Sequence, residues 1–185
     1  MPKSLDASAD SDHAGDPVSR KSTSGLVLMY GEHCLKTSST VQGPIGLSSG
    51  ESEYYSCVLG GATLLGASAI LSEWGVDPRR ALIVRSDSSA AIGFAKRRGL
   101  GRQRHVSTRH LWLQDKVASG TLKVFKVATK DQLGDSPTKA STASALRAHM
   151  PRFGLRVRDG TARAQRELLL DDAPLEQITY EHLRS

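Results

Sequence analysis

The chain has 185 residues, of which 38% are hydrophobic and 24% are charged, and its formal net charge is +6. This length and apolar content allow one compact domain with a hydrophobic core, and no apolar run approaches the roughly 20 residues that cross a bilayer. The two cysteines, Cys34 and Cys57, lack the spacing of a zinc site or a disulfide framework. We therefore expect an intracellular protein, cytoplasmic or nuclear, without a signal peptide or a membrane segment.

The first part of the chain predicts a frayed start followed by a pair of strands. Residues 1–9 are polar and acidic, and we expect them to be frayed. Residues 24–30 and 33–38 have the composition of strands, and the Gly-Glu step at residues 31–32 is typical of a tight turn. Residues 41–47 should connect or extend the sheet.

A long helix and then alternating strands and helices are expected in the rest of the domain. Ser48 and Glu51 form a capping-box pattern, which starts a helix that runs to about Trp74. Apolar runs and capping serines then predict a strand, two helices and a strand, at residues 81–86, 88–98, 107–118 and 121–127. A second capping-box pattern at Thr129 predicts a helix that carries Asp135. This order predicts an α/β domain with a mixed sheet.

Acidic residues stand at the ends or openings of these predicted elements, and they are Asp10, Glu53, Asp87 and Asp135. Mg²⁺ prefers hard oxygen ligands, and two such ions can activate a water and stabilise the leaving oxygen of a phosphodiester. Taken singly, each acid has a commoner explanation. An Asp at a strand end is usually a turn or cap residue, and a Glu in the first helical turn usually complements the helix dipole. Spacing alone therefore leaves the chemistry open.

Residues 96–110 form a basic segment that contains no acid. Its lysine and arginines are Lys96, Arg97, Arg98, Arg102, Arg104 and Arg109. The commoner interpretation of such a run is a solvated loop and helix face. Because Gly99 and Gly101 would allow close approach to a backbone, and because arginines pair with phosphates, the segment is also a candidate nucleic-acid-binding surface.

Five separate parts of the sequence, in matching order and spacing over about residues 5–155, resemble the ribonuclease H domain of copia-type retrotransposons. They are residues 10–25 (DSDHAGD to RKSTSG), 47–55 (LSSGESEYY), 87–91 (DSSAA), 104–109 (RHVSTR) and 127–139 (VATKDQLGDSPTK). The resemblance implies a ribonuclease H-like α/β fold with a five-stranded mixed sheet flanked by helices. We assign it to residues 1–155, and residues 156–185 to an appended charged tail with helical patterning.

The resemblance also implies an activity. It implies cleavage of the RNA strand of RNA–DNA hybrids with two Mg²⁺ ions, for which Mn²⁺ can substitute. The metal ligands and catalytic residues that it implies are Asp10, Glu53, Asp87 and Asp135. The implied partners are the hybrid itself and the reverse transcriptase and integrase parts of an ancestral polyprotein, which are absent from this chain.

Two acids compete for one place in this set. Glu51 and Glu53 are two residues apart and so project about 200° apart on a helix. Hydrophobicity does not decide which one faces the sheet, although small residues near Glu53 would let that side of the helix lie close to it. The family pattern favours Glu53 as the ligand and Glu51 as the capping residue.

The end of the domain departs from the family pattern. An interior proline costs a helix about 3 kcal/mol and a glycine about 1 kcal/mol, so Pro137 and Gly134 disfavour the predicted helix around Asp135. If the helix restarts at Pro137, Asp135 lies in the joining loop. Three readings therefore stay open: an active hybrid ribonuclease, a non-catalytic remnant that keeps the fold and binds nucleic acid, and a nuclease acting on another substrate such as DNA.

Overall fold

The computed structural model describes residues 4–76, 82–101, 103–138 and 142–155. The predicted tail at residues 156–185 lies outside these ranges, and so does Arg102 of the basic segment. The division of the chain into a domain and a tail therefore stays a prediction.

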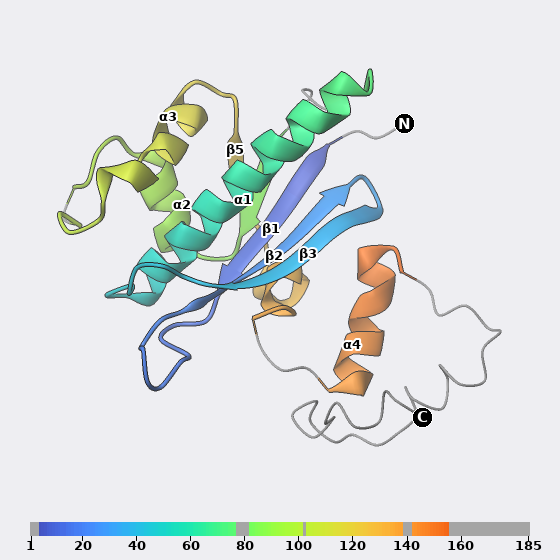
Figure 1. The fold of residues 1–185 in the computed structure, drawn as a ribbon, viewed down its shortest axis with the longest axis horizontal. Helices are drawn as coiled ribbons and strands as arrows, with labels where there is room; N and C mark the ends of the chain where they lie inside the picture. Colours follow the sequence, from blue (N-terminus) through green and yellow to red (C-terminus); the bar gives the residue numbers. More distant parts are fainter. Residues whose placement is uncertain (1–3, 77–81, 102, 139–141, 156–185) are drawn as a thin grey trace.

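Five strands form one mixed sheet, as predicted (Figure 1). They are β1 (Leu5–Ser11), β2 (Thr23–Tyr30), β3 (His33–Val41), β4 (Leu82–Ser86) and β5 (Lys123–Lys126), in the spatial order β3-β2-β1-β4-β5. The first three strands pair antiparallel, whereas β4 runs parallel to both β1 and β5. The sheet thus joins a hairpin meander to a parallel half, and β1 lies at the junction.

The expectation that residues 1–9 are frayed is wrong for the described part of this segment. Residues 5–9 belong to β1, which is the central strand and pairs on both sides. The sequence alternates apolar residues, which are fully buried at Leu5, Ala7 and Ala9, with polar ones. The acidic residues obscure this alternation, but Asp6 is paired with Arg85 of the neighbouring strand at 2.7 Å. Sheet pairing on both sides and this ion pair order a segment that looks polar on its own.

Four helices accompany the sheet among the described residues. They are α1 (Ser49–Glu73), α2 (Ser89–Lys96), α3 (Trp112–Ala118) and α4 (Ala143–His149). The predicted start of α1 is confirmed, because the Ser48 hydroxyl accepts the Glu51 N–H. Ser88 caps α2 in the same way through the N–H of Ala91. The predicted helix at residues 107–118 is shorter, because it begins with the 3₁₀ turn η1 (Thr108–His110).

Helix α1 crosses one face of the sheet and forms the main core with it (Figure 1). Its small residues make this approach possible, as predicted. A β-carbon on Gly60 would lie 3.4 Å from that of Ala9 in β1, whereas one on Gly61 would lie 3.0 Å from the side chain of Leu113 in α3. By length and composition α1 could also cross a membrane. In this structure it is instead the central helix of the core, and the expected absence of a membrane segment remains a prediction.

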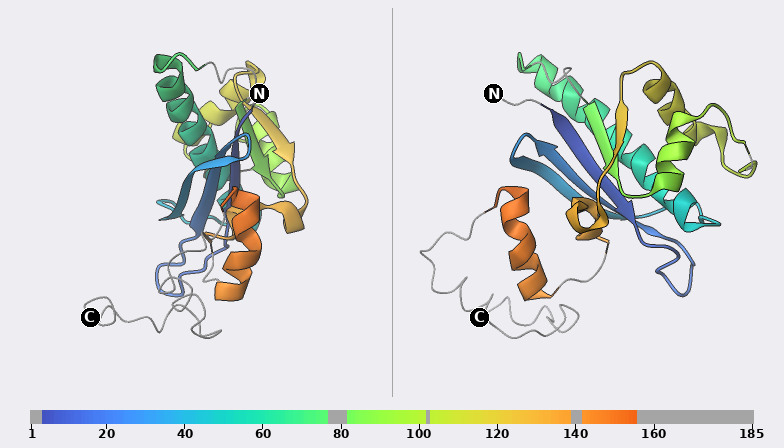
Figure 2. Two further views of the ribbon diagram at one scale, coloured as in Figure 1. Left: turned by 90° about the vertical axis from the view of Figure 1, so that its right-hand side faces the viewer. Right: turned by 180° about the vertical axis from the view of Figure 1, so that it is seen from behind.

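The other face of the sheet carries short turns rather than a long helix, and α4 packs on one of these turns, η4 (Figure 2). The turns are η2 (Thr129–Asp131), η3 (Leu133–Asp135) and η4 (Met150–Phe153). Phe153 packs there with Val27 and Met29 in a second, smaller cluster. The predicted helix that should carry Asp135 is therefore wrong, since Asp135 ends a 3₁₀ turn.

The reason lies in the side chain of Gln132. It is 2% exposed. Its amide donates to the carbonyl oxygen of Ala9 at 3.0 Å, and its carbonyl accepts the N–H of Gly134. Gln132 therefore caps the short turn η3 and joins it to the sheet, instead of completing the capping box of a longer helix.

Candidate active site

Three of the predicted acids meet at one edge of the sheet. Asp10 is the penultimate residue of β1, Asp87 directly follows β4, and Glu53 lies in the second turn of α1. Because β1 and β4 are parallel neighbours, their carboxyl ends lie at the same edge. One carboxylate oxygen from each of the three residues lies within 4.8 Å of the others. We call these three residues the acidic cluster.

The acidic cluster is electrostatically unfavourable without a cation. Burial raises the pKa of Glu53 to about 8, and the charges of Asp10 and Asp87 add to the increase. The Oε2 atom of Glu53 is buried and has no hydrogen-bond partner among the described residues. Buried polar atoms are nearly always paired, so an unpaired carboxylate oxygen needs an explanation. A hard divalent cation would supply the missing partner and offset the repulsion, so these residues fit such an ion.

The fourth predicted acid, Asp135, is not part of this group of three. It lies in η3, and the neighbouring Gly134 is packed directly on β1 beside the cluster. A β-carbon on Gly134 would come within 2.9 Å of the backbone nitrogen of Asp10. The segment that carries Asp135 is thus held beside the acidic cluster, although its carboxylate is not in the group.

Comparison with known proteins agrees with the resemblance read from the sequence, although no family model matches the chain. Over 153 residues, or 82% of this chain, it is 29% identical to the retrovirus-related Pol polyprotein from transposon RE1 of Arabidopsis thaliana, and equally to that from transposon RE2. It is 30% identical over 131 residues to the Pol polyprotein from transposon TNT 1-94 of Nicotiana tabacum, where the match covers 70% of this chain. The chain is homologous to a segment of copia-type transposon Pol polyproteins. It spans only 10% of their length.

A solved structure identifies the fold. The chain superposes on LC11-RNase H1, isolated from compost by a metagenomic approach, with a TM-score of 0.51 and 15% identity. The match covers 80% of this chain and 98% of that one. The predicted ribonuclease H-like fold is therefore confirmed.

Within this ribonuclease H-like domain, Glu51 has a larger structural role than the predicted one. Its carboxylate does reach back toward the start of the helix, but it accepts the N–H of Leu47 at 3.2 Å, one residue before the N-cap Ser48. It also accepts the hydroxyl of Tyr55 and pairs with His105, each at 2.7 Å. Burial raises the pKa of this carboxyl, but the bonds from His105, Tyr55 and Leu47 outweigh burial, so the pKa lies below its usual value. The i, i+4 spacing of Glu51 and Tyr55 signals one of these contacts, whereas nothing local signals the contact with His105.

A buried polar network that sequence reasoning missed fixes the start of α1 to the sheet. Gln42 is 6% exposed, and its amide donates to the Ser24 hydroxyl and to the carbonyl oxygen of Ser52, each at 2.9 Å. Ser56 bonds to Ser24 at 2.8 Å. These bonds hold the helical turn that carries Glu53 against β2.

The basic segment contains two kinds of cation. Arg97 is engaged in the fold, because its guanidinium bonds to the carbonyl oxygen of Leu100 at 2.6 Å and to the Gln103 side chain at 3.0 Å. It also lies 4.1 Å above the ring of Phe94. Among the lysine and arginines of this segment that the structure describes, the exposed ones are Lys96, Arg98, Arg104 and Arg109. These four, rather than Arg97, present charge to solvent.

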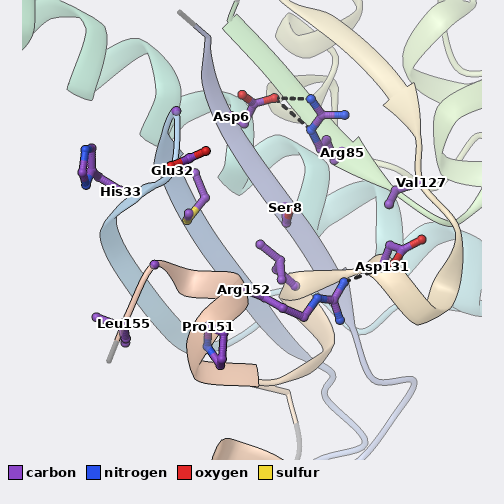
Figure 3. A pocket seen from close by; sticks show the side chains of 14 residues that line it. Asp6, Ser8, Glu32, His33, Arg85, Val127, Asp131, Pro151, Arg152 and Leu155 are labelled. Carbon is purple, nitrogen blue, oxygen red and sulfur yellow. Dashed lines mark hydrogen bonds and ion pairs between the residues drawn. The ribbon is translucent and has the colours of Figure 1, made fainter. Parts of the chain in front are cut away.

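Away from the acidic cluster, a hollow of about 900 Å³ lies on the face of the sheet that carries η4 (Figure 3). The ion pairs Asp6–Arg85 and Asp131–Arg152 stand on its walls. None of the four predicted acids lines it. Two of its acids, Asp6 and Asp131, are already paired with arginines within the fold, and the described residues that line it form no group like the acidic cluster, so the acidic cluster remains the stronger candidate for chemistry.

Proposed function

We propose that the chain hydrolyses the RNA strand of RNA–DNA hybrids, with two divalent cations held by Asp10, Glu53, Asp87 and Asp135. The observation that carries this proposal is the acidic cluster at the sheet edge, with its carboxylate oxygens within 4.8 Å of one another. The ribonuclease H-like fold and the Pol polyprotein relatives support it.

Two bound cations would lower the pKa of the attacking water and offset the charge on the departing 3′ oxygen. The residues of the chain position this chemistry. Asp10 and Asp87 project from strand ends, and Glu53 is held by the polar network under α1. The segment that carries Asp135 packs on β1 next to Asp10 through Gly134, and we propose that the Asp135 carboxylate completes the set. Mg²⁺ is the expected ion, because these ligands are all carboxylates, and Mn²⁺ is the expected substitute.

The exposed cations of the basic segment are the proposed contacts with the hybrid. Recognition of such a duplex depends on its shape, phosphates and 2′-hydroxyls rather than on sequence. We propose that the chain acts in reverse transcription within the cell, in the cytoplasm or nucleus, with reverse transcriptase and integrase as partners. The proposal rests on the polyproteins it resembles, since the chain itself spans a tenth of their length.

A cleavage assay tests this function. A labelled RNA–DNA hybrid, an RNA duplex, a DNA duplex and single-stranded RNA are incubated with the protein and Mg²⁺. We expect cleavage of the hybrid's RNA strand, its loss in Asp87→Asn, and wild-type cleavage in the control Asp115→Asn, which alters an exposed acid of α3.

Other outcomes would assign other functions. Cleavage of the DNA duplex in preference to the hybrid would mean a nuclease for another substrate. Hybrid binding without cleavage in any divalent cation would favour a non-catalytic remnant that binds nucleic acid. In that case the acidic cluster would have lost its use in this chain.

A further inference from the structure

His105 and Glu51 form a hydrogen-bonded pair whose acidic partner is buried. The Glu51 side chain is 1% exposed and that of His105 is 44% exposed. The Nε2 atom of His105 lies 2.7 Å from Oε2 of Glu51. A buried carboxylate must be hydrogen-bonded, so removal of the imidazole would leave Glu51 short of a partner. The pair therefore has a definite geometry rather than the loose one of a surface ion pair.

This pair belongs to a set of contacts between α1 and residues 105–110 of the basic segment. The hydroxyl of Tyr54 donates to the carbonyl oxygen of His110 at 2.7 Å. The ring of Tyr55 lies 4.7 Å from that of His110. Between these anchors, Val106 is buried in the main core. The first turns of α1 thus hold both ends of residues 105–110. Arg109 is exposed within this stretch, and Arg104 directly precedes it.

The same turns of α1 carry an acid of the cluster. Glu51 and Glu53 are separated by one residue and point in different directions, Glu51 to His105 and Glu53 to Asp10 and Asp87. This turn of α1 therefore contacts the segment that carries Arg104 and Arg109, and it also contributes Glu53 to the acidic cluster. A duplex held by both would have its phosphates placed relative to the cluster by this turn.

We propose that His105 is a positioning residue for substrate: through Glu51 it fixes the basic segment relative to the acidic cluster, so that Arg104 and Arg109 meet the phosphates of the hybrid in register with the cluster. This inference rests on the proposed function. It assigns to His105 and Glu51 a role in binding the hybrid and none in the bond-breaking step. A purely structural role would instead change stability and leave the affinity of the folded protein unchanged.

The test compares His105→Leu and Glu51→Gln with His33→Leu, which alters an exposed histidine at the start of β3. The dissociation constant for an RNA–DNA hybrid is measured at several salt concentrations, on protein that thermal unfolding shows to be folded. We expect His105→Leu to weaken binding about tenfold. The slope of the logarithm of the binding constant against the logarithm of salt concentration (the salt slope) should become smaller by about one to two, because each lost phosphate contact lowers this slope by roughly one. Cleavage at saturating hybrid should fall less than the affinity does, because the residues of the acidic cluster are themselves unchanged.

Glu51→Gln serves as the second variant if His105→Leu does not fold, and it should weaken binding in the same direction. The double variant should bind the hybrid no more weakly than whichever single variant binds it more weakly, because both changes break the same contact between His105 and Glu51. The inference is overturned if the folded single variants match His33→Leu in both affinity and salt slope. If the wild type cleaves the hybrid, that result overturns this inference alone. If the wild type neither binds nor cleaves it, the proposed function and this inference are both overturned.

Discussion

Gly25 of β2 and Gly134 of η3 are packed directly against each other beside the acidic cluster. A β-carbon on Gly25 would overlap the carbonyl oxygen of Gly134, and one on Gly134 would lie 2.9 Å from the backbone nitrogen of Asp10. Gly25 is also the register partner of Asp10 in the β1–β2 ladder. Two glycines from distant parts of the chain thus let η3 lie flat on the sheet next to Asp10.

Gly134→Ala should therefore displace η3 and lower both stability and cleavage. We expect a loss of about 1–3 kcal/mol in the free energy of unfolding, as for other overpacked sites, and a fall in cleavage of the order of 10- to 100-fold if Asp135 moves by about 1 Å. Denaturant unfolding and the hybrid assay measure the two effects. The control is Gly93→Ala in α2, where an added β-carbon meets no atom within 4 Å. Equal stability and equal cleavage in Gly134→Ala and Gly93→Ala would mean that the close packing of Gly134 on Asp10 is not important.

Divalent cations should stabilise the folded chain through the acidic cluster. At a Mg²⁺ concentration of 100 times its dissociation constant, one site adds about 2.7 kcal/mol to the free energy of unfolding. This should raise the melting temperature by roughly 2–4 °C per kcal/mol for a chain of this size. Thermal unfolding across a Mg²⁺ titration checks this. Asp87→Asn should lose the shift and Asp115→Asn should keep it, and a shift that survives in Asp87→Asn would place the ion elsewhere.

Without metal, stability should fall as pH rises through the range set by Glu53. Its folded pKa is raised from 4.5 to about 8, with burial as the largest cause. Between these values the folded state holds a proton that the unfolded state has released, so raising the pH favours unfolding by at most about 1.4 kcal/mol per pH unit. Thermal unfolding in chelator from pH 5 to pH 8 measures this trend. Glu53→Gln should flatten it, and an equal slope in the variant would assign the trend to other groups.

The arginines of the basic segment should divide into structural and binding residues. Arg97→Gln removes the bonds to Leu100 and Gln103 and the contact with Phe94, and it should lower the free energy of unfolding by about 1–3 kcal/mol. Arg98→Gln alters an exposed side chain and should leave stability unchanged while reducing the salt slope of hybrid binding by about one. Melting temperatures and salt-dependent affinities distinguish the two. The reverse pattern would contradict this division.

Much of the fold could be predicted because local signals and sheet position agree there. The cap at Ser48, the strand pair around Gly31 and the small face of α1 are all local patterns, and the structure has them. The central strand β1 was missed because its order comes from pairing on both sides, and no window of sequence contains its partners.

In the candidate site, too, the contacts between residues distant in sequence were the ones that local patterns did not predict. The meeting of Asp10, Glu53 and Asp87 was inferred from resemblance to a family, since each acid alone looks like a cap or turn residue. The turn around Asp135 was missed because Gln132 bonds across the sheet, 123 positions away in sequence, to Ala9. The link between His105 and Glu51 spans 54 positions and leaves no periodic trace.

The central position of β1 also decides how the domain can be fused to other polypeptides. Leu5 starts the strand and Asp10 lies near its end, so at about 3.3 Å per residue the two are roughly 17 Å apart. A polypeptide joined upstream would emerge at the opposite rim of the sheet from the acids. A solubility tag or a preceding polyprotein module attached there would leave the approach of a duplex to the acids unobstructed.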